Sequence, residues 1–214
     1  MIRAGAPVSR ASAGLVLLHG RGGTAADILS LPAHAGLPEI AAIAPEAPGH
    51  SWWPTSFLAP AAQMEPFVEQ GLAAVREAVA ALETEGLARG RIWLGGFSQG
   101  ACLAAEAFAR EGAGLAGLLA FSGGLVGTGD ASDTPDPALY GQRRKRFDYD
   151  GDLDGAQVWL SVHERDPHIP LARARESAEV FAALGAAVEF HPHPGAGHGV
   201  MQDDIAALRA RLNR

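Results

Sequence analysis

Short apolar runs alternate with longer segments of mixed polarity along this chain. The runs have few polar interruptions, which is typical of strands buried on both faces of a parallel sheet. The clearest runs span residues 13–19, 40–44, 91–96, 117–122, 156–162 and 187–191. The first ten residues are short and mixed, and they fit either an edge strand or a tail.

The segments between these runs show helical spacing or helix-boundary signals. Thr24 can cap a helix that runs to about residue 31, where Pro32 limits it. Residues 63–85 place apolar side chains on one helical face. That face consists of Phe67, Leu72, Val75, Val79 and Leu82. Further helices are expected from Ser98 to about residue 111, over 170–184 and over 199–212.

Strands that alternate with helices predict an α/β fold, in which a mostly parallel sheet has helices on both faces. The chain has 214 residues, 48% of them hydrophobic, which suits one domain with a substantial core and is short for two. Residues 1–214 are therefore interpreted as a single domain. Outside residues 45–60 and 125–155 the intervals between elements are short, so no large cap domain is expected.

Charge and cysteine content narrow the classes of function. The net charge of −7 and the pI near 5.6 argue against a nucleic-acid-binding protein, because such proteins need a basic surface. The basic run at 143–146 is interpreted as a loop compensated by nearby aspartates. Cys102 is the single cysteine, and we interpret it as a buried small residue. Since no signal-like segment or long apolar run is present, we expect a cytoplasmic protein without membrane insertion.

The rest of the chain is organised around residues 92–100, Ile-Trp-Leu-Gly-Gly-Phe-Ser-Gln-Gly. An apolar run ends there, and Ser98 stands between Gly96 and Gly100 at the start of a helix-forming segment. A strand-turn-helix of this kind presents a serine hydroxyl above the sheet, beside a helix N-terminus that favours developing negative charge. G-x-S-x-G also arises by chance in a glycine-rich chain. The prediction of a functional serine therefore rests on the strand before Ser98 and the helix after it.

Two further polar residues follow later strands, at the sheet edge where function gathers in such folds. Asp166 comes soon after residues 156–162, and His198 lies in the glycine-rich turn after 187–191. The order Ser, Asp, His is that of α/β-hydrolases. A serine hydroxyl needs a neutral imidazole to take its proton, and the imidazole needs an acceptor on its other nitrogen. We therefore predict Ser98 as nucleophile, His198 as base and Asp166 as acid.

Five motifs, in this order, support a family resemblance. They are Leu-Leu-His-Gly-Arg-Gly-Gly (17–23), Gly-Phe-Ser-Gln-Gly (96–100), Phe-Ser-Gly-Gly-Leu (121–125), Asp-Pro-His-Ile-Pro (166–170) and Gly-His (197–198). The chain resembles, nearly end to end, the carboxylesterase, phospholipase and acyl-protein thioesterase family of small α/β-hydrolases. The resemblance implies the same triad and an oxyanion hole made by the backbone N–H groups of Arg21 and Gln99. The expected enzyme is a metal-independent serine hydrolase with no cofactor.

The chain departs from the family pattern in two places. The acid is preceded by Ser161-Val-His-Glu-Arg, where the family usually has small residues, so Glu164 competes with Asp166 for the acid role. The excursion at 125–155 is long and charged, and it either covers the site or decorates an edge of the sheet.

The aromatic loop at residues 45–60 supplies candidates for the substrate site. Its apolar side chains either anchor the loop or form the wall of an acyl or aryl pocket. They are Trp52, Trp53, Phe57 and Leu58. We expect a small-molecule ester with a short acyl or aryl group as substrate, with thioesters and lysophospholipids as alternatives. The same loop could also serve as the surface of a homodimer.

The sequence also allows an alternative function and alternative roles for several histidines. A non-catalytic binding protein of the same fold is the alternative function, although it would not need an activated nucleophile. His19 is expected to shape the oxyanion loop. His191 and His193 could form a metal-binding pair, but the chain offers no third ligand at a suitable spacing, so no metal site is predicted.

Overall fold

A seven-stranded sheet forms the centre of the computed structural model, which describes residues 1–129 and 134–213. The strand order is β1-β3-β2-β4-β5-β6-β7. Only β1 runs antiparallel among the described strands, as an edge strand against β3, and the other pairs are parallel. The strands are β1 Ile2–Gly5, β2 Gly14–Leu18, β3 Ala41–Ala44, β4 Ile92–Phe97, β5 Gly117–Phe121, β6 Gln157–Arg165 and β7 Ala187–Ala196.

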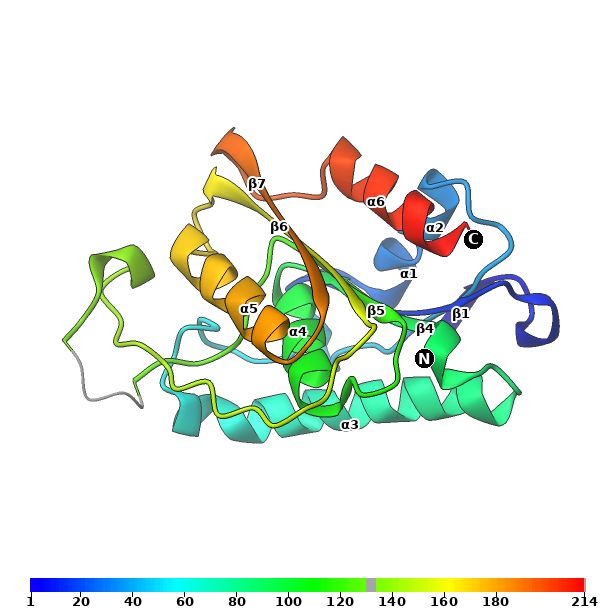
Figure 1. Ribbon diagram of the computed structural model, residues 1–214, viewed down its shortest axis with the longest axis horizontal. Helices are drawn as coiled ribbons and strands as arrows, with labels where there is room; N and C mark the ends of the chain where they lie inside the picture. Colours follow the sequence, from blue (N-terminus) through cyan, green and yellow to red (C-terminus); the bar gives the residue numbers. More distant parts are fainter. Residues whose placement is uncertain (130–133, 214) are drawn as a thin grey trace.

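Helices cover both faces of this sheet, as Figure 1 shows. One layer contains α3 Ala61–Thr84, α4 Gln99–Glu111 and α5 Leu171–Ala183. The other contains α1 Ala25–Ile28, α2 Ser30–His34 and α6 Gln202–Leu212. This arrangement confirms the predicted α/β class with a mostly parallel sheet. No helix in the described part of the chain is long and apolar enough to cross a membrane.

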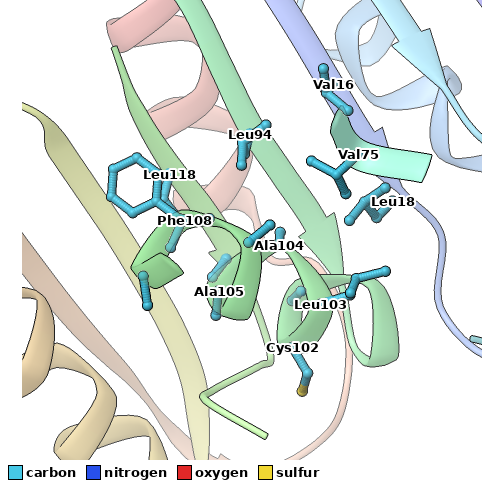
Figure 2. Packing of buried hydrophobic residues seen from close by; sticks show 14 of the residues in the cluster. Val16, Leu18, Val75, Leu94, Cys102, Leu103, Ala104, Ala105, Phe108 and Leu118 are labelled. Atoms are coloured by element: carbon cyan, nitrogen blue, oxygen red, sulfur yellow. The ribbon is translucent and has the colours of Figure 1, made fainter. Parts of the chain in front are cut away.

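The central strands divide their side chains between two hydrophobic clusters. On β2, Val16 and Leu18 point to the α3–α4 layer, whereas Leu15 and Leu17 point to the opposite layer. This alternation follows from the two-residue period of a strand, and it explains why the run reads as continuously apolar. Figure 2 shows Leu103 and Phe108 of α4 packed among the strand residues of the first cluster. The sheet thus holds α4, and with it Ser98, in a rigid frame.

The helix predicted from Thr24 is two helices. Thr24 and Asp27 form a capping box at the start of α1, as the sequence indicates, but α1 ends at Ile28. The prediction that Pro32 ends the helix is wrong, since Pro32 lies in the first turn of α2. A proline is tolerated there because the first N–H groups of a helix have no intrahelical partner to lose.

β6 and β7 are longer than predicted and pair with each other past the end of β5. Pairing of β5 with β6 stops at Phe121 and Ser161, whereas β6 and β7 remain paired to Arg165 and Ala196. They form a two-stranded ribbon that projects beyond the sheet (Figure 1). The apolar pattern stops where the hydrophobic core stops, so it did not reveal this extension. The last helix, in contrast, is shorter than predicted, because it starts at Gln202 and not at residue 199.

Glu106 of α4 anchors the excursion at 125–155 through hydrogen bonds. This carboxylate is fully buried and accepts hydrogen bonds from the Val126 N–H (2.8 Å), the Tyr149 hydroxyl (2.8 Å) and Lys145 Nζ (2.9 Å). Arg144 pairs instead with Asp136 and Glu176, each at 2.6 Å. Two members of the basic run, Arg144 and Lys145, therefore lie beside acidic groups, while compensation by the aspartates that follow the run stays a prediction.

Candidate active site

Ser98 occupies the sharp turn between β4 and α4. Its backbone dihedral angles are φ 55° and ψ −119°, a conformation that is strained for any residue with a side chain. Gly96 and Gly100 are required by space: a Cβ on Gly96 would lie 2.5 Å from the carbonyl carbon of Gly100, and one on Gly100 would lie 2.1 Å from the oxygen of Leu18. The glycines therefore allow the strand and helix to approach closely enough to hold Ser98 at the apex.

Three polar side chains from separate strand ends form one hydrogen-bonded line. The Oγ of Ser98 and Nε2 of His198 are 2.8 Å apart, and Nδ1 of His198 and Oδ2 of Asp166 are 2.8 Å apart. Phe97 and His168 contact the His198 ring, with centroid distances of 5.1 and 4.8 Å, and so restrict its rotation. The structure thus brings together the three residues that the sequence proposed for the triad.

Asp166 is held as a carboxylate by its surroundings. Burial by itself would raise its pKa, but the hydrogen bond with His198 and those from the N–H groups of His168 (2.8 Å) and Ile169 (3.0 Å) together lower the pKa below its ordinary value. Glu164 lies elsewhere, exposed on the ribbon, where it accepts a hydrogen bond from the Gly195 N–H. Only Asp166 of these two carboxylates is in contact with His198.

The N–H groups of Arg21 and Gln99 are the candidate oxyanion donors. Gln99 is the first residue of α4, so its N–H has no partner within the helix and carries the favourable end of the helix dipole. Arg21 lies in the turn after β2, and both residues border the same cleft as Ser98. A carbonyl oxygen above Ser98 would meet donors from two different elements.

The side chains of these two residues organise the aromatic loop. Gln99 Oε1 accepts a hydrogen bond from the Trp52 N–H, and Gln99 Nε2 donates one to the Trp53 oxygen, each at 2.8 Å. The Arg21 guanidinium donates to the backbone oxygens of Pro54 (3.0 Å) and Thr55. The loop is therefore attached to both candidate oxyanion residues, a role of their side chains that sequence motifs did not reveal.

His19 supports the same region from inside. It is 1% exposed, its Nε2 accepts from the Ala47 N–H (3.1 Å), and its Nδ1 lies 2.8 Å from the Gly20 oxygen. Trp52 Nε1 donates to the His19 oxygen at 2.9 Å. Both ring nitrogens are thus engaged with backbone, which agrees with the predicted shaping role.

A cleft of about 630 Å³ opens above Ser98. Trp53 and Phe57 of the aromatic loop line it, but Trp52 and Leu58 do not, although all four side chains belong to the same hydrophobic cluster. The assignment of Trp52 and Leu58 to the substrate site stays a prediction, although neither residue borders this cleft. All four side chains are buried and expose little apolar surface, and the homodimer stays a prediction.

The cleft has further walls that sequence reasoning missed. Phe97 precedes Ser98, His168 and Ile169 follow Asp166, and Tyr140 comes from the excursion. The Tyr140 hydroxyl donates to the backbone oxygen of Asp166, which joins the excursion to the acid loop. Adjacency to the triad could have indicated the first three residues, but nothing in the sequence around Tyr140 indicated it. The excursion therefore borders the site.

Cys102 also approaches this cleft from α4 but is not a candidate nucleophile. It is fully buried, and burial raises the pKa of its thiol to about 12. A protonated, inaccessible thiol is unreactive, which confirms the interpretation of Cys102 as a packing residue.

Comparisons with known proteins agree with this architecture. The sequence model of the phospholipase/carboxylesterase family matches residues 3–136. A phospholipase/carboxylesterase from Dyadobacter fermentans, known from a crystal structure, has 38% sequence identity to this chain. The match covers 100% of this chain and 95% of the Dyadobacter chain, with a TM-score of 0.86. Acyl-protein thioesterase 1 of Gibberella zeae is 28% identical over 129 residues, 60% of this chain but only about half (50%) of that relative's length. The esterase PE8 structure (24% identity, 99% and 96% coverage, TM-score 0.74) shares the fold, and these likenesses confirm the α/β-hydrolase class.

Proposed function

The chain belongs to the phospholipase/carboxylesterase family, and on that premise we propose that it is a serine hydrolase of short-chain or aryl carboxylic esters. Membership of this family supports ester-hydrolase activity. The observation that carries the finer proposal is the unbroken hydrogen-bonded line from Ser98 Oγ through His198 to Asp166. Such a line is the arrangement that a serine hydroxyl needs in order to attack a carbonyl.

In the acylation step, the Ser98 hydroxyl gives its proton to Nε2 of His198 while Oγ forms a bond to the ester carbonyl carbon. Asp166 keeps Nδ1 protonated and stabilises the imidazolium that forms. Negative charge develops on the former carbonyl oxygen, where the N–H groups of Arg21 and Gln99 stabilise it. The bond to the alcohol oxygen then breaks, the alcohol leaves with the proton from His198, and the acyl group stays on Ser98.

In the deacylation step, water takes the place of the alcohol. His198 accepts a proton from this water as its oxygen attacks the acyl carbon, and the same two N–H groups stabilise the second oxyanion. The bond to Ser98 Oγ then breaks, His198 returns the proton to Oγ, and a carboxylic acid leaves. No step in this sequence requires a group other than the named residues and water.

The cleft supports a short acyl or aryl substrate. Its apolar walls include Trp53, Phe57 and Ile169, and Tyr140 adds an aromatic ring with 51% exposure. Each methylene buried against such walls contributes about 0.8 kcal/mol, until the chain extends past them into water. The likeness to an acyl-protein thioesterase makes thioesters the second bond type to test.

The test is active-site labelling with a fluorophosphonate, which reacts with activated serines. We expect stoichiometric labelling, with the mass of the adduct mapped to the peptide that contains Ser98, and none in Ser98→Ala. Matched acetyl esters and thioesters of an aryl alcohol and an aryl thiol then rank the two bond types. A folded wild-type protein that neither labels nor hydrolyses any of these would instead be the non-catalytic binding protein.

A further inference from the structure

Three metal-ligating side chains meet on the ribbon side of the molecule, apart from the triad. His191 and His193 belong to β7, and Asp203 belongs to the first turn of α6 (Figure 1). One donor atom from each residue lies within 4.8 Å of the other two. The two histidines are two residues apart on a strand, so their side chains share one face. Asp203 supplies the third ligand that spacing along the chain did not indicate.

The outer half of this cluster is already arranged for binding. His191 Nε2 lies 3.2 Å from Asp203 Oδ2. The His191 ring stacks on Trp159, with a centroid distance of 5.1 Å and an interplanar angle of 21°, which fixes the direction of the imidazole. The side chains of His191 and Asp203 are 40% and 64% exposed, so an ion can reach them from solvent.

The inner half contains a buried nitrogen without a hydrogen bond. His193 is 4% exposed, and its Nε2 has no hydrogen-bond partner among the described residues. The nearest acidic oxygen is Oδ2 of the fully buried Asp204, at 3.5 Å. Asp204 itself accepts hydrogen bonds from Trp159 Nε1 and the Met201 N–H, both at 2.8 Å. Nε2 therefore faces the Asp204 carboxylate, and Nδ1 is the ring nitrogen of His193 that remains for a metal ion.

We propose that His191, His193 and Asp203 bind a divalent transition-metal ion of the zinc class. Two imidazoles and one carboxylate suit such ions, whereas Ca²⁺ and Mg²⁺ prefer sites made of oxygen ligands. Tetrahedral bonds of about 2.0–2.1 Å place ligand atoms about 3.3 Å apart, so rotation of the exposed side chains closes the cluster around an ion. A water molecule can take the fourth position on the exposed side.

Asp204 gives the site a second layer of support. Metal-bound histidines usually donate their other ring N–H group to a carboxylate, which orients the ring. Asp204 Oδ2 faces Nε2 of His193, so this carboxylate is placed to accept the Nε2–H group when Nδ1 binds the ion, and its two hydrogen bonds hold it in place. Arg211 does not compete for it, because its guanidinium pairs with Glu189 at 2.7 Å.

The ion would act as a clamp on the segment that contains His198. This segment leaves β7 and enters α6, so its two ends carry the proposed ligands. The rings of His193 and His163 are 5.3 Å apart, and a Cβ on Gly197 would lie 2.7 Å from His163 Nε2. The histidine rings thus pack between the proposed site and the backbone next to His198. The inference does not depend on hydrolysis by Ser98.

The test is zinc binding by the full chain after removal of any polyhistidine tag and extraction with a chelator. ZnCl₂ is titrated against a chromophoric competitor, with CaCl₂ and MgCl₂ as hard-cation comparisons. We expect one Zn²⁺ per chain and a higher melting temperature with zinc. His191→Gln and Asp203→Asn should each weaken zinc affinity by at least about tenfold and abolish the rise in melting temperature.

The variants are chosen so that folding does not obscure the result. Both replace exposed side chains, and His34→Gln on α2 is the matched control that should bind zinc as the wild type does. Failure of the wild type to take up zinc would overturn the proposal. Unchanged affinity in both His191→Gln and Asp203→Asn would also overturn it, and tighter binding of Ca²⁺ than of Zn²⁺ would overturn the assigned metal class.

Discussion

The side-chain amide of Gln99 donates a hydrogen bond to the backbone oxygen of Trp53 at 2.8 Å. Together with the bond from the Trp52 N–H, it attaches the aromatic loop to the residue after Ser98. One residue thereby supplies a candidate oxyanion donor through its backbone and positions a wall of the cleft through its side chain. The wall and the turn at Ser98 are therefore mechanically coupled.

This coupling can be tested with Gln99→Ala. The backbone N–H remains, but the loop loses both hydrogen bonds: the Trp52 N–H loses its partner, whereas the Trp53 oxygen keeps its bond from the Ser51 hydroxyl. We expect the free energy of unfolding to fall by about 1–3 kcal/mol and kcat/KM on aryl esters to fall by about tenfold, mainly through KM. Urea unfolding and steady-state kinetics measure the two effects. Gln63→Ala, which removes an exposed glutamine from α3, should change neither.

Ser98→Ala tests the nucleophile. The variant should fold normally and lose about 10³-fold or more in ester hydrolysis, because the acyl-enzyme route closes while the oxyanion donors remain. Circular dichroism and initial rates check the two statements. Ser9→Ala, a change at an exposed serine of the N-terminal segment, should retain full activity. Comparable rates in the two variants would remove Ser98 from the mechanism.

Asp166→Asn and Glu164→Gln form a matched pair of neutralised carboxylates. In the first variant a neutral amide replaces the carboxylate that orients His198 and stabilises its imidazolium, so we expect kcat to fall by about three to four orders of magnitude. Glu164 contacts the Gly195 N–H on the exposed ribbon, so its replacement should leave kcat within about twofold of the wild type. The reverse ranking would transfer the acid role to Glu164.

The lowered pKa of Asp166 predicts a pH-dependent contribution to stability. Because the folded-state pKa is below the unfolded value of about 3.9, the contribution is fully present above that value and is lost as the pH falls through the folded-state pKa. The difference in unfolding free energy between wild type and Asp166→Asn should be constant near neutral pH and shrink in acid. Urea titrations from about pH 7 to the lowest pH at which both proteins fold would measure it. A difference that grows in acid would contradict the assigned shift.

Acyl-chain length tests the shape of the cleft. We expect the highest kcat/KM on acetyl to hexanoyl aryl esters and a decline by dodecanoyl, because added methylenes gain nothing once they extend past the wall. Trp53→Ala should abolish this preference. Trp52→Ala should keep it, since Trp52 is also buried but does not border the cleft.

Melting curves of both tryptophan variants are needed, because loss of a buried tryptophan costs about 3–5 kcal/mol of stability. Activity that keeps rising through palmitoyl esters would instead favour a long acyl groove.

Much of the framework was predictable because its causes are local in the chain. Continuous apolar runs identify strands buried on both faces, and the positions of Gly96 and Gly100 are dictated by close approach of strand and helix. The order of Ser98, Asp166 and His198 along the chain, placed after three parallel strands, predicted that they would meet at one edge of the sheet. Errors arose where the hydrophobic signal ended, as in the extension of β6 and β7 beyond the core.

Other features depended on which distant segments meet, and no local pattern encodes that. Trp52 and Trp53 are adjacent and equally apolar, yet only Trp53 borders the cleft, because Gln99 and His19 set the direction of the loop. Tyr140 reaches the site from the excursion, which distant residues such as Glu106 anchor. The apolar runs and the spacing of glycines predicted the strands and the turn at Ser98, and the chain order of Ser98, Asp166 and His198 predicted their meeting. The tertiary structure decided the walls of the cleft and the meeting of Asp203 with two histidines, since side-chain direction and long-range packing exist only in the folded chain.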